Sequence, residues 1–292
     1  MADSLRELVA EEVSLPVDSR VAAMAEAIAG KHGKASRAVL FYGSCLRQEQ
    51  LEGLMLDFYL IVSDYREAYG RRWLAVANRL IPPNVFYFEA GGLAAKYAVL
   101  SDADFKRECG PGARSTSVVA RFAQPSRLAW SAGKAAREHA IDAIAQCAPS
   151  LLGRAGPLAP KNAAVLDLWK RAFQLTFGAE LRAERGDRSE SIVEADAERY
   201  RRFGAAAVAE LPPEDSSTAG RWWKRMQRKG KLRSVLRLAK ASATFAGGAD
   251  YIAWKINRHA GTKIELKPWQ RRHPLLAGIS LLPRLLKSGA VR

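Results

Sequence analysis

Residues 40–62, LFYGSCLRQEQLEGLMLDFYLIV, constrain the fold most, because they combine two apolar runs with a Gly-Ser pair and a single carboxylate. The first run ends at Tyr42 and continues into Gly43 and Ser44, which predicts a strand that leads into a turn. Asp57 stands at the head of the second run, which predicts a carboxylate at the start of another strand. Such a turn can offer backbone N–H groups and a hydroxyl to phosphates, and such a carboxylate can hold a divalent cation.

The spacing of these groups favours nucleotidyl transfer. Twelve residues separate Ser44 from Asp57, which is within the range that DNA polymerase beta-like nucleotidyltransferases use. Those enzymes usually carry a second acid two positions after the first, where alternation along the strand puts both carboxylates on one face. This chain has Tyr59 at that position. An ordinary turn and a solvated Asp at a strand end explain the same residues without any catalysis.

A closer resemblance is carried by the runs FYGSCLRQ (41–48), MLDFYLIVSDY (55–65), NVFYFE (84–89), KYAVLS (96–101) and ARFAQP (120–125). In order and in rough spacing they resemble the mitochondrial-type phosphatidate cytidylyltransferase family, also called the translocator assembly and maintenance family. Its corresponding stretches read like YGSG, MLDF before an apolar strand, KYGVIS and AGRLQKP. The resemblance covers residues 35–130 well and the basic C-terminal region loosely, and it does not extend to residues 131–220. The chain departs from the family pattern at Cys45, Ala98, Ala120 and Gln124.

This resemblance implies transfer of CMP from CTP to phosphatidic acid, which gives CDP-diacylglycerol and pyrophosphate. It places the nucleotide at Tyr42, Gly43 and Ser44, an Mg²⁺ or other divalent cation at Asp57, and catalytic cations at Lys96 and Arg121. Glu89 lies on the third predicted strand and would be a second metal ligand if that strand neighbours the strand of Asp57. A solvated strand end explains Glu89 equally well.

The charge of the chain is concentrated in its last quarter. Residues 221–292 contain 18 Lys or Arg and two acidic residues, whereas residues 1–220 contain 28 basic and 28 acidic residues. A segment of that kind repels itself unless it faces a polyanion, and the usual partners are nucleic acid and an anionic membrane. Nucleic acid is the less favoured partner, because no zinc-ligand spacing, aromatic RNA-binding strand or recognition helix accompanies the charge.

Aromatic and apolar residues within the basic segment favour the membrane. Trp222, Trp223, Trp254 and Trp269 have the amphipathic side chain that suits the headgroup level. In residues 268–292, leucines and an isoleucine recur near helical spacing beside Arg and Lys, which predicts an interfacial segment. A terminal helix that packs on the core would show the same pattern.

The coarse pattern predicts an α+β fold, with a small mixed-sheet nucleotidyltransferase domain, a mainly helical region and a basic amphipathic C-terminal segment. The expected boundaries are 1–108, 109–210 and 211–292, with LPPEDSSTAG (211–220) as a linker. Strands are expected at 37–42, 56–62, 84–89 and 96–101, a helix at 65–80, and helices from about residue 115 to 205.

Three cysteines without a CxxC motif, and an N-terminus without a signal or transit pattern, favour a reducing cytoplasm. We therefore expect a bacterial protein that lies on the inner face of the cell membrane. Two other functions fit the same sequence. One is a nucleotidyltransferase that acts on RNA or on a small hydroxylated acceptor, and the other is a membrane- or RNA-binding adaptor that has lost catalysis.

Overall fold

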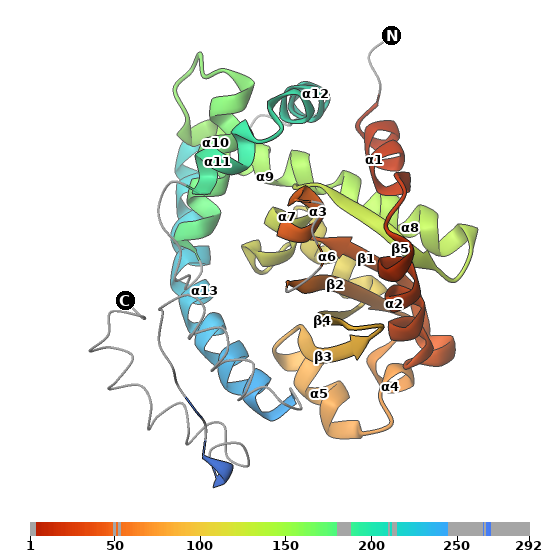
Figure 1. Ribbon diagram of the computed structural model, residues 1–292. Coiled ribbons are helices and arrows are strands. Elements are labelled where there is room, and N and C mark those ends of the chain that lie inside the picture. Colours follow the sequence, from red (N-terminus) through yellow and green to blue (C-terminus); the bar gives the residue numbers. More distant parts are fainter. Residues whose placement is uncertain are drawn as a thin grey trace.

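The computed structural model describes residues 4–48, 51, 54–179, 188–209, 211, 215–244, 265 and 267–269. A mixed sheet of five strands forms its centre, with helices on both faces (Figure 1). The strands are β1 (Ser36–Tyr42), β2 (Met55–Val62), β3 (Asn84–Ala90), β4 (Leu93–Ser101) and β5 (Ser126–Ser131). Their order is β3-β4-β2-β1-β5, in which β2 and β4 pair in parallel and every other pair is antiparallel. The predicted α+β class is confirmed.

Both faces of the sheet are covered because the central strands are apolar on both sides. On one face Leu40 and Tyr59 belong to a core that is completed by one group of helices, namely α1 (Leu5–Ser14), α6 (Asp102–Cys109), α7 (Thr116–Phe122), α8 (Lys134–Ala145) and α9 (Cys147–Ala155). On the other face Phe41 and Phe58 belong to a second core. Its helical members come from α2 (Ser19–Gly30), η1 (Gly33–Ala35), α3 (Ser44–Gln48), α4 (Tyr65–Ala68) and α5 (Arg72–Leu80).

A group of helices follows the sheet and shares its first core. These helices are η2 (Gly156–Leu158), α10 (Val165–Gly178), α11 (Arg188–Glu194) and α12 (Ala197–Val208). Trp169, Phe173 and Tyr200 fill the contact between α10 and α12. A buried ion pair between Glu12 of α1 and Arg199 of α12 ties these helices to the N-terminal helix. The side chains of the pair are only 11% and 7% exposed, so both charges depend on each other for solvation.

The long helix α13 (Ser216–Thr244) runs along one side of the molecule (Figure 1). Its first half docks on the other helices through Ala219, Trp223 and Met226, which are buried. The indole N–H of Trp223 donates to the carbonyl of Arg154 at 2.8 Å. The predicted place of Trp223 at a lipid headgroup level is therefore wrong. Trp222 packs partly buried against the same core.

Two other local predictions need correction. Residues 126–131, predicted to be helical, form strand β5, which pairs with β1 and so extends the sheet past the predicted boundary at residue 108. Within the predicted linker, α13 already begins at residue 216. Most of the predicted interfacial segment lies outside the described residues, since only 268 and 269 of residues 268–292 are described, and Trp254 also lies outside.

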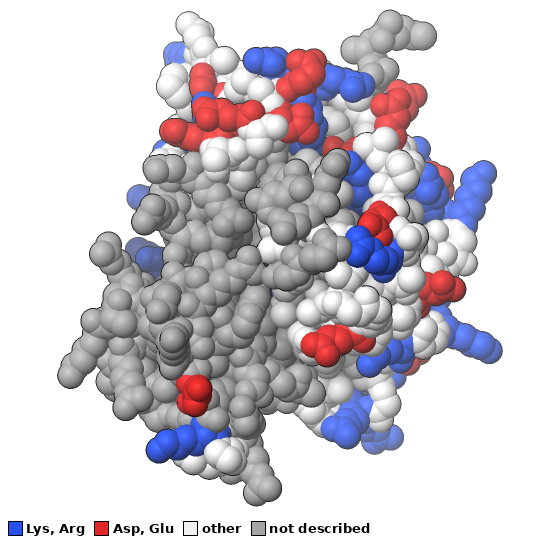
Figure 2. All heavy atoms as spheres, in the orientation of Figure 1, with Lys and Arg blue, Asp and Glu red and all other residues white. Residues whose placement is uncertain are grey.

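The surface charge differs between α13 and the other helices. Acidic and basic side chains lie side by side over α10, α11 and α12 at the top of the view (Figure 2). In contrast, α13 contains nine Lys or Arg and no acidic residue. Among the helices that the structure describes, none combines the length and the apolar character required to cross a bilayer.

Candidate active site

The predicted turn closes directly on the predicted carboxylate. Strand β1 ends at Tyr42, Gly43 has a φ of +99°, and α3 starts at Ser44. A side chain is disfavoured at this φ, and a Cβ at residue 43 would lie 3.0 Å from Asp57 Oδ2. Glycine therefore allows the backbone of the turn to rest against Asp57. The first backbone N–H groups of a helix have no carbonyl partner within that helix, so those of α3 are candidate donors to an anion at this edge of the sheet.

Asp57 and Lys96 are neighbours across the parallel ladder. Asp57 of β2 is aligned with Tyr42 of β1 on one side and with Lys96 of β4 on the other. Lys96 Nζ lies 3.0 Å from Asp57 Oδ1, and the two side chains are 29% and 19% exposed. The pair is thus open to solvent at one edge, where a charged ligand can reach it.

Arg121 lies over the same face of the sheet. It is in the last turn of α7, and its guanidinium carbon is 5.1 Å from the ring centre of Tyr42 and 5.8 Å from that of Tyr59. Its Nη1 donates to the hydroxyls of Tyr59 and Ser117, both at 3.3 Å. The fold therefore brings the predicted turn, carboxylate and two cations to one face.

Tyr59 has a role that the sequence did not reveal. It stands two positions after Asp57, where DNA polymerase beta-like nucleotidyltransferases usually carry a second acid, but it is buried and packs against Tyr42 and Phe122. Its hydroxyl accepts the hydrogen bond from Arg121. Tyr59 thus holds the guanidinium in place. Asp57 and Tyr59 are two residues apart on one strand and so share a face, which was the sequence signal that could have suggested this role.

Glu89 does not meet the condition for a second metal ligand. Strand β4 lies between β2 and β3, and Glu89 pairs with Ala94, two residues before Lys96. Two strand spacings and two residues of rise put its Cα about 12 Å from that of Asp57. The Glu89 side chain is exposed on the edge strand. The reason is the strand order: β2 pairs with β4 and not with β3, so β4 lies between the strands of the two acidic residues.

Tyr97, the neighbour of Lys96 in the predicted KY pair, points to the other face. Its hydroxyl lies 3.2 Å from His32 Nε2, within a buried aromatic group that also includes Tyr69 and Phe86. Burial lowers the pKa of His32 below its ordinary value. Tyr97 therefore belongs to the second core and not to the site of Asp57.

The donor set of the site suits a cation that takes its other ligands from a substrate. The part of the chain that the structure describes contains no group of three or more His, Cys, Asp or Glu side chains able to hold a metal. Mg²⁺ commonly binds through one or two carboxylates together with substrate phosphates and water. Asp57 alone fits that pattern when a nucleotide supplies the remaining oxygens.

No protein-family model matches the chain, and no curated protein matches it either.

Proposed function

We propose that the protein is a nucleotidyltransferase that transfers CMP from CTP to phosphatidic acid and so makes CDP-diacylglycerol. The observation that supports nucleotidyl transfer best is the contact between Gly43 and the carboxylate of Asp57. The turn that would bind phosphate lies against the carboxylate that would bind the metal ion. The choice of CTP and phosphatidic acid rests on the family resemblance of residues 35–130.

The reaction needs alignment and charge neutralisation more than covalent help. A phosphate oxygen of phosphatidic acid forms a bond to the α-phosphorus of CTP, and the bond from that phosphorus to the bridging oxygen breaks to release pyrophosphate. The attacking phosphate is already anionic at neutral pH, so no strong general base is required. Catalysis can rest on holding both phosphates in line within a cationic site.

Each site residue then has a distinct task. Ser44 and the start of α3 bind the triphosphate, and Lys96 and Arg121 offset the negative charge of the two substrates. Asp57 would hold Mg²⁺, which when bound neutralises and orients the phosphates. The 3.0 Å contact with Lys96 keeps the carboxylate oriented before substrates bind. Tyr59 positions Arg121 through its hydroxyl.

The lipid substrate requires contact with a membrane surface. The 18 basic residues among residues 221–292 give the chain the charge needed to lie on an anionic leaflet. We propose that it does so on the cytoplasmic face of a bacterial membrane, as a peripheral protein.

The test is to incubate the protein with labelled CTP, Mg²⁺ and liposomes that contain phosphatidic acid. We expect labelled CDP-diacylglycerol and one equivalent of pyrophosphate. Asp57→Ala should abolish turnover, whereas the control Asp64→Ala should retain it, because Asp64 caps α4 on the surface and is 45% exposed. More than a few per cent of residual activity in Asp57→Ala would disprove its assignment as the metal ligand, and label transferred to RNA instead of lipid would identify a different acceptor.

A binding adaptor without catalysis is the second candidate. The observation in its favour is that Asp57, the carboxylate assigned to the site, is already paired with Lys96. Calorimetry with CTP separates the two functions from each other. An adaptor would bind vesicles but would show neither Mg²⁺-dependent CTP binding nor release of pyrophosphate.

A further inference from the structure

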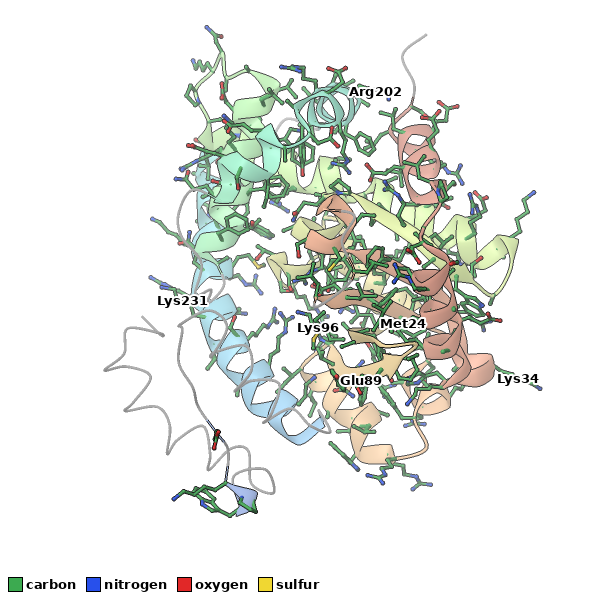
Figure 3. All side chains as sticks on the ribbon, viewed as in Figure 1. Met24, Lys34, Glu89, Lys96, Arg202 and Lys231 are labelled. Carbon is green, nitrogen blue, oxygen red and sulfur yellow. The ribbon has the colours of Figure 1, made fainter. Side chains whose placement is uncertain are left out.

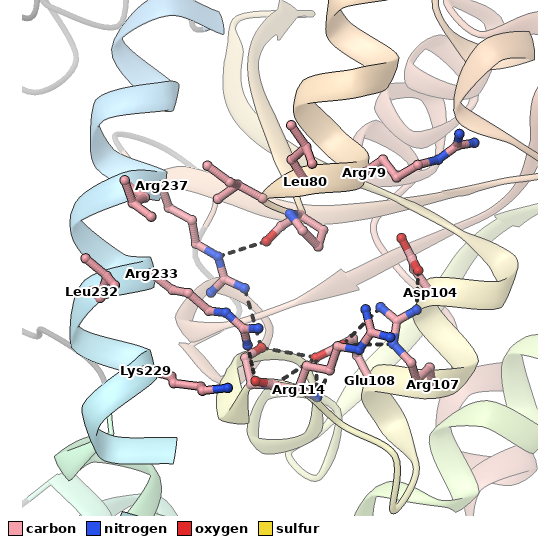
Figure 4. Close-up of a pocket in the computed structure, with 14 residues that line it drawn as sticks. Arg79, Leu80, Asp104, Arg107, Glu108, Arg114, Lys229, Leu232, Arg233 and Arg237 are labelled. Atoms are coloured by element: carbon pink, nitrogen blue, oxygen red, sulfur yellow. Dashed lines mark hydrogen bonds and ion pairs between the residues drawn. The ribbon is translucent and has the colours of Figure 1, made fainter. Parts of the chain in front are cut away.

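A cavity of about 440 Å³ lies between α13 and the sheet-bearing part of the molecule (Figure 4). Its walls are the second half of α13, the end of α5 with the Pro82 turn, helix α6, and the loop that leads from α6 to Ser115. None of the residues assigned above to the candidate active site lines this cavity. It is therefore a separate feature of the molecule.

Four basic side chains of the cavity form no ion pair with the acidic residues that the structure describes. They are Arg114, Lys229, Arg233 and Arg237, and no acidic side chain of the described chain forms an ion pair with any of them. Arg233 donates to the carbonyl of Arg114, and Arg237 donates to the carbonyl of Pro82 at 2.8 Å. Each guanidinium has five N–H donors, so donors remain after these contacts. Figure 4 shows Lys229, Arg233 and Arg237 reaching from α13 towards Arg114.

The two acidic residues of the cavity are committed to local structure. Glu108 is buried and accepts hydrogen bonds from the backbone N–H and the hydroxyl of Ser115, at 3.1 and 3.2 Å. It also accepts from Arg107 at 3.1 Å. Asp104 accepts from the hydroxyl of Tyr65 and from Arg107, both at 2.5 Å. These carboxylates hold the walls of the cavity together, and neither of them forms an ion pair with the cations of α13.

The remaining cations repel one another. Burial lowers the pKa of Arg233, and although Glu108 raises that pKa, Arg237, Arg114 and Arg107 lower it further. A bound anion would relieve this repulsion. Guanidinium groups that converge from two segments suit a phosphate, because each can donate two parallel hydrogen bonds to it.

The rim of the cavity is apolar and exposed. Leu80, Leu232 and Leu236 line it and are 74%, 62% and 41% exposed. Leu80 also ends a stripe along α5 that includes Trp73 and Val76, which are 47% and 57% exposed. Residues 73, 76 and 80 share one helix face, and a solvent-exposed stripe of this kind is typical of a surface that meets lipid.

We propose that this cavity binds the phosphate of an anionic phospholipid headgroup, while the leucine rim and the α5 stripe enter the interfacial layer of the membrane. The occupant is a lipid and not a free phosphate, because the charged interior opens directly onto exposed apolar side chains. The inference deepens the proposed function and rests on it for the presence of a membrane partner. It assigns that contact to α5 and α13, at a site apart from Asp57.

The experiment measures sedimentation of the full chain with vesicles, in the absence of nucleotide. The vesicles contain phosphatidylcholine alone or phosphatidylcholine with phosphatidic acid. The pocket variant is Arg233→Gln with Arg237→Gln. The matched control is Lys224→Gln with Lys231→Gln, which removes the same charge from the opposite side of α13; Figure 3 shows Lys231 pointing away from the sheet.

We expect the pocket variant to lose about 30-fold in partitioning onto phosphatidic acid vesicles, since each cation near an anionic surface contributes about fivefold. The control should lose less than about fivefold. Trp73→Ser with Leu80→Ser should weaken the binding that remains at 1 M salt, where charge is screened over about 3 Å. If the pocket variant does not fold, Lys229→Gln with Leu232→Ser replaces it, because both side chains are exposed.

Two results would overturn the inference. Equal losses in the pocket and control variants would show that α13 acts through its general charge. The second result is a pocket variant that no longer binds pyrophosphate in calorimetry but binds vesicles as well as the control variant does. It would assign the cavity to a free phosphate. Turnover on a soluble short-chain phosphatidic acid, measured in the same variants, reports on the Asp57 site alone. If the unaltered protein showed no such turnover, the proposed function would be contradicted. The vesicle experiment would then decide by itself whether the cavity binds lipid.

Discussion

Substitution of Gly43 by alanine tests the contact on which the candidate site depends. At a φ of +99° a residue with a side chain costs about 1–3 kcal/mol of folding free energy. The added Cβ would also lie 3.0 Å from Asp57 Oδ2 and 3.4 Å from Asp57 Cβ. Since the shorter contact is tighter than ordinary van der Waals separation, either the turn or the carboxylate must move by a few tenths of an ångström.

That movement should affect turnover more than stability. A misplacement of about 1 Å can cost a hundredfold in rate, so a shift of a few tenths should lower kcat/KM by about tenfold. The assay is the initial rate of pyrophosphate release with a soluble short-chain phosphatidic acid, accompanied by urea unfolding. The control is Gly33→Ala, where φ is +53° and no heavy atom lies within 4 Å of the place that the new Cβ would occupy. It should lose about 1 kcal/mol of stability and keep its kcat/KM within about twofold.

The two variants separate backbone strain from displacement of the carboxylate. An unchanged kcat/KM in Gly43→Ala would refute the argument that the turn and Asp57 must touch. An equal loss of kcat/KM in Gly33→Ala would assign the effect to general destabilisation.

Three further outcomes are expected. Glu12→Gln should lower the free energy of unfolding by about 3–5 kcal/mol in urea titrations, because it leaves Arg199 buried and uncompensated; Glu11→Gln, from an exposed pair, should change it by less than about 1 kcal/mol. Burial, helped by a neighbouring guanidinium, lowers the pKa of Lys240 to about 7 from 10.5, so the unfolded chain binds the extra proton between those values. The free energy of unfolding of the unaltered protein should therefore rise with pH across that window relative to that of Lys240→Met. If the difference between the two free energies did not change with pH, the lowered pKa would be contradicted. Ser44→Ala should raise KM for CTP or lower kcat in the same rate assay, and unchanged constants would make it a turn residue only.

Local pattern was sufficient for the strands that carry the site. The apolar runs around Tyr42 and Asp57 predicted β1 and β2, and KYAVLS predicted most of β4. The order of the strands could not be predicted, because a strand run contains no information about its neighbours when the connections are long enough for several topologies. The alignment of Asp57 with Lys96 and the separation of Glu89 both follow from that order.

Tertiary contacts explain the sequence predictions that were wrong. SRLAWS lies between helical stretches rich in Ala and Arg, and its strand character depends on pairing with β1. Pro125 and Gly133, which bound the run, were the local signals that could have indicated a separate element. Trp223 has the amphipathic side chain of an interfacial residue, but its N–H finds a carbonyl of Arg154 in the core instead. The sequence shows which hydrogen bonds a side chain is able to make, but the partner that it finds depends on the fold.

The position of β5 has a consequence for the way the chain assembles during synthesis. Strand β1 is complete at Tyr42, but its second neighbour is made only when residues 126–131 have emerged from the ribosome. Until then the outer N–H and C=O groups of an apolar strand stand unpaired, which is the arrangement that promotes association between nascent chains. A gene fragment that stops at residue 108 would make this transient state permanent. The smallest self-sufficient unit of the protein must therefore include β5.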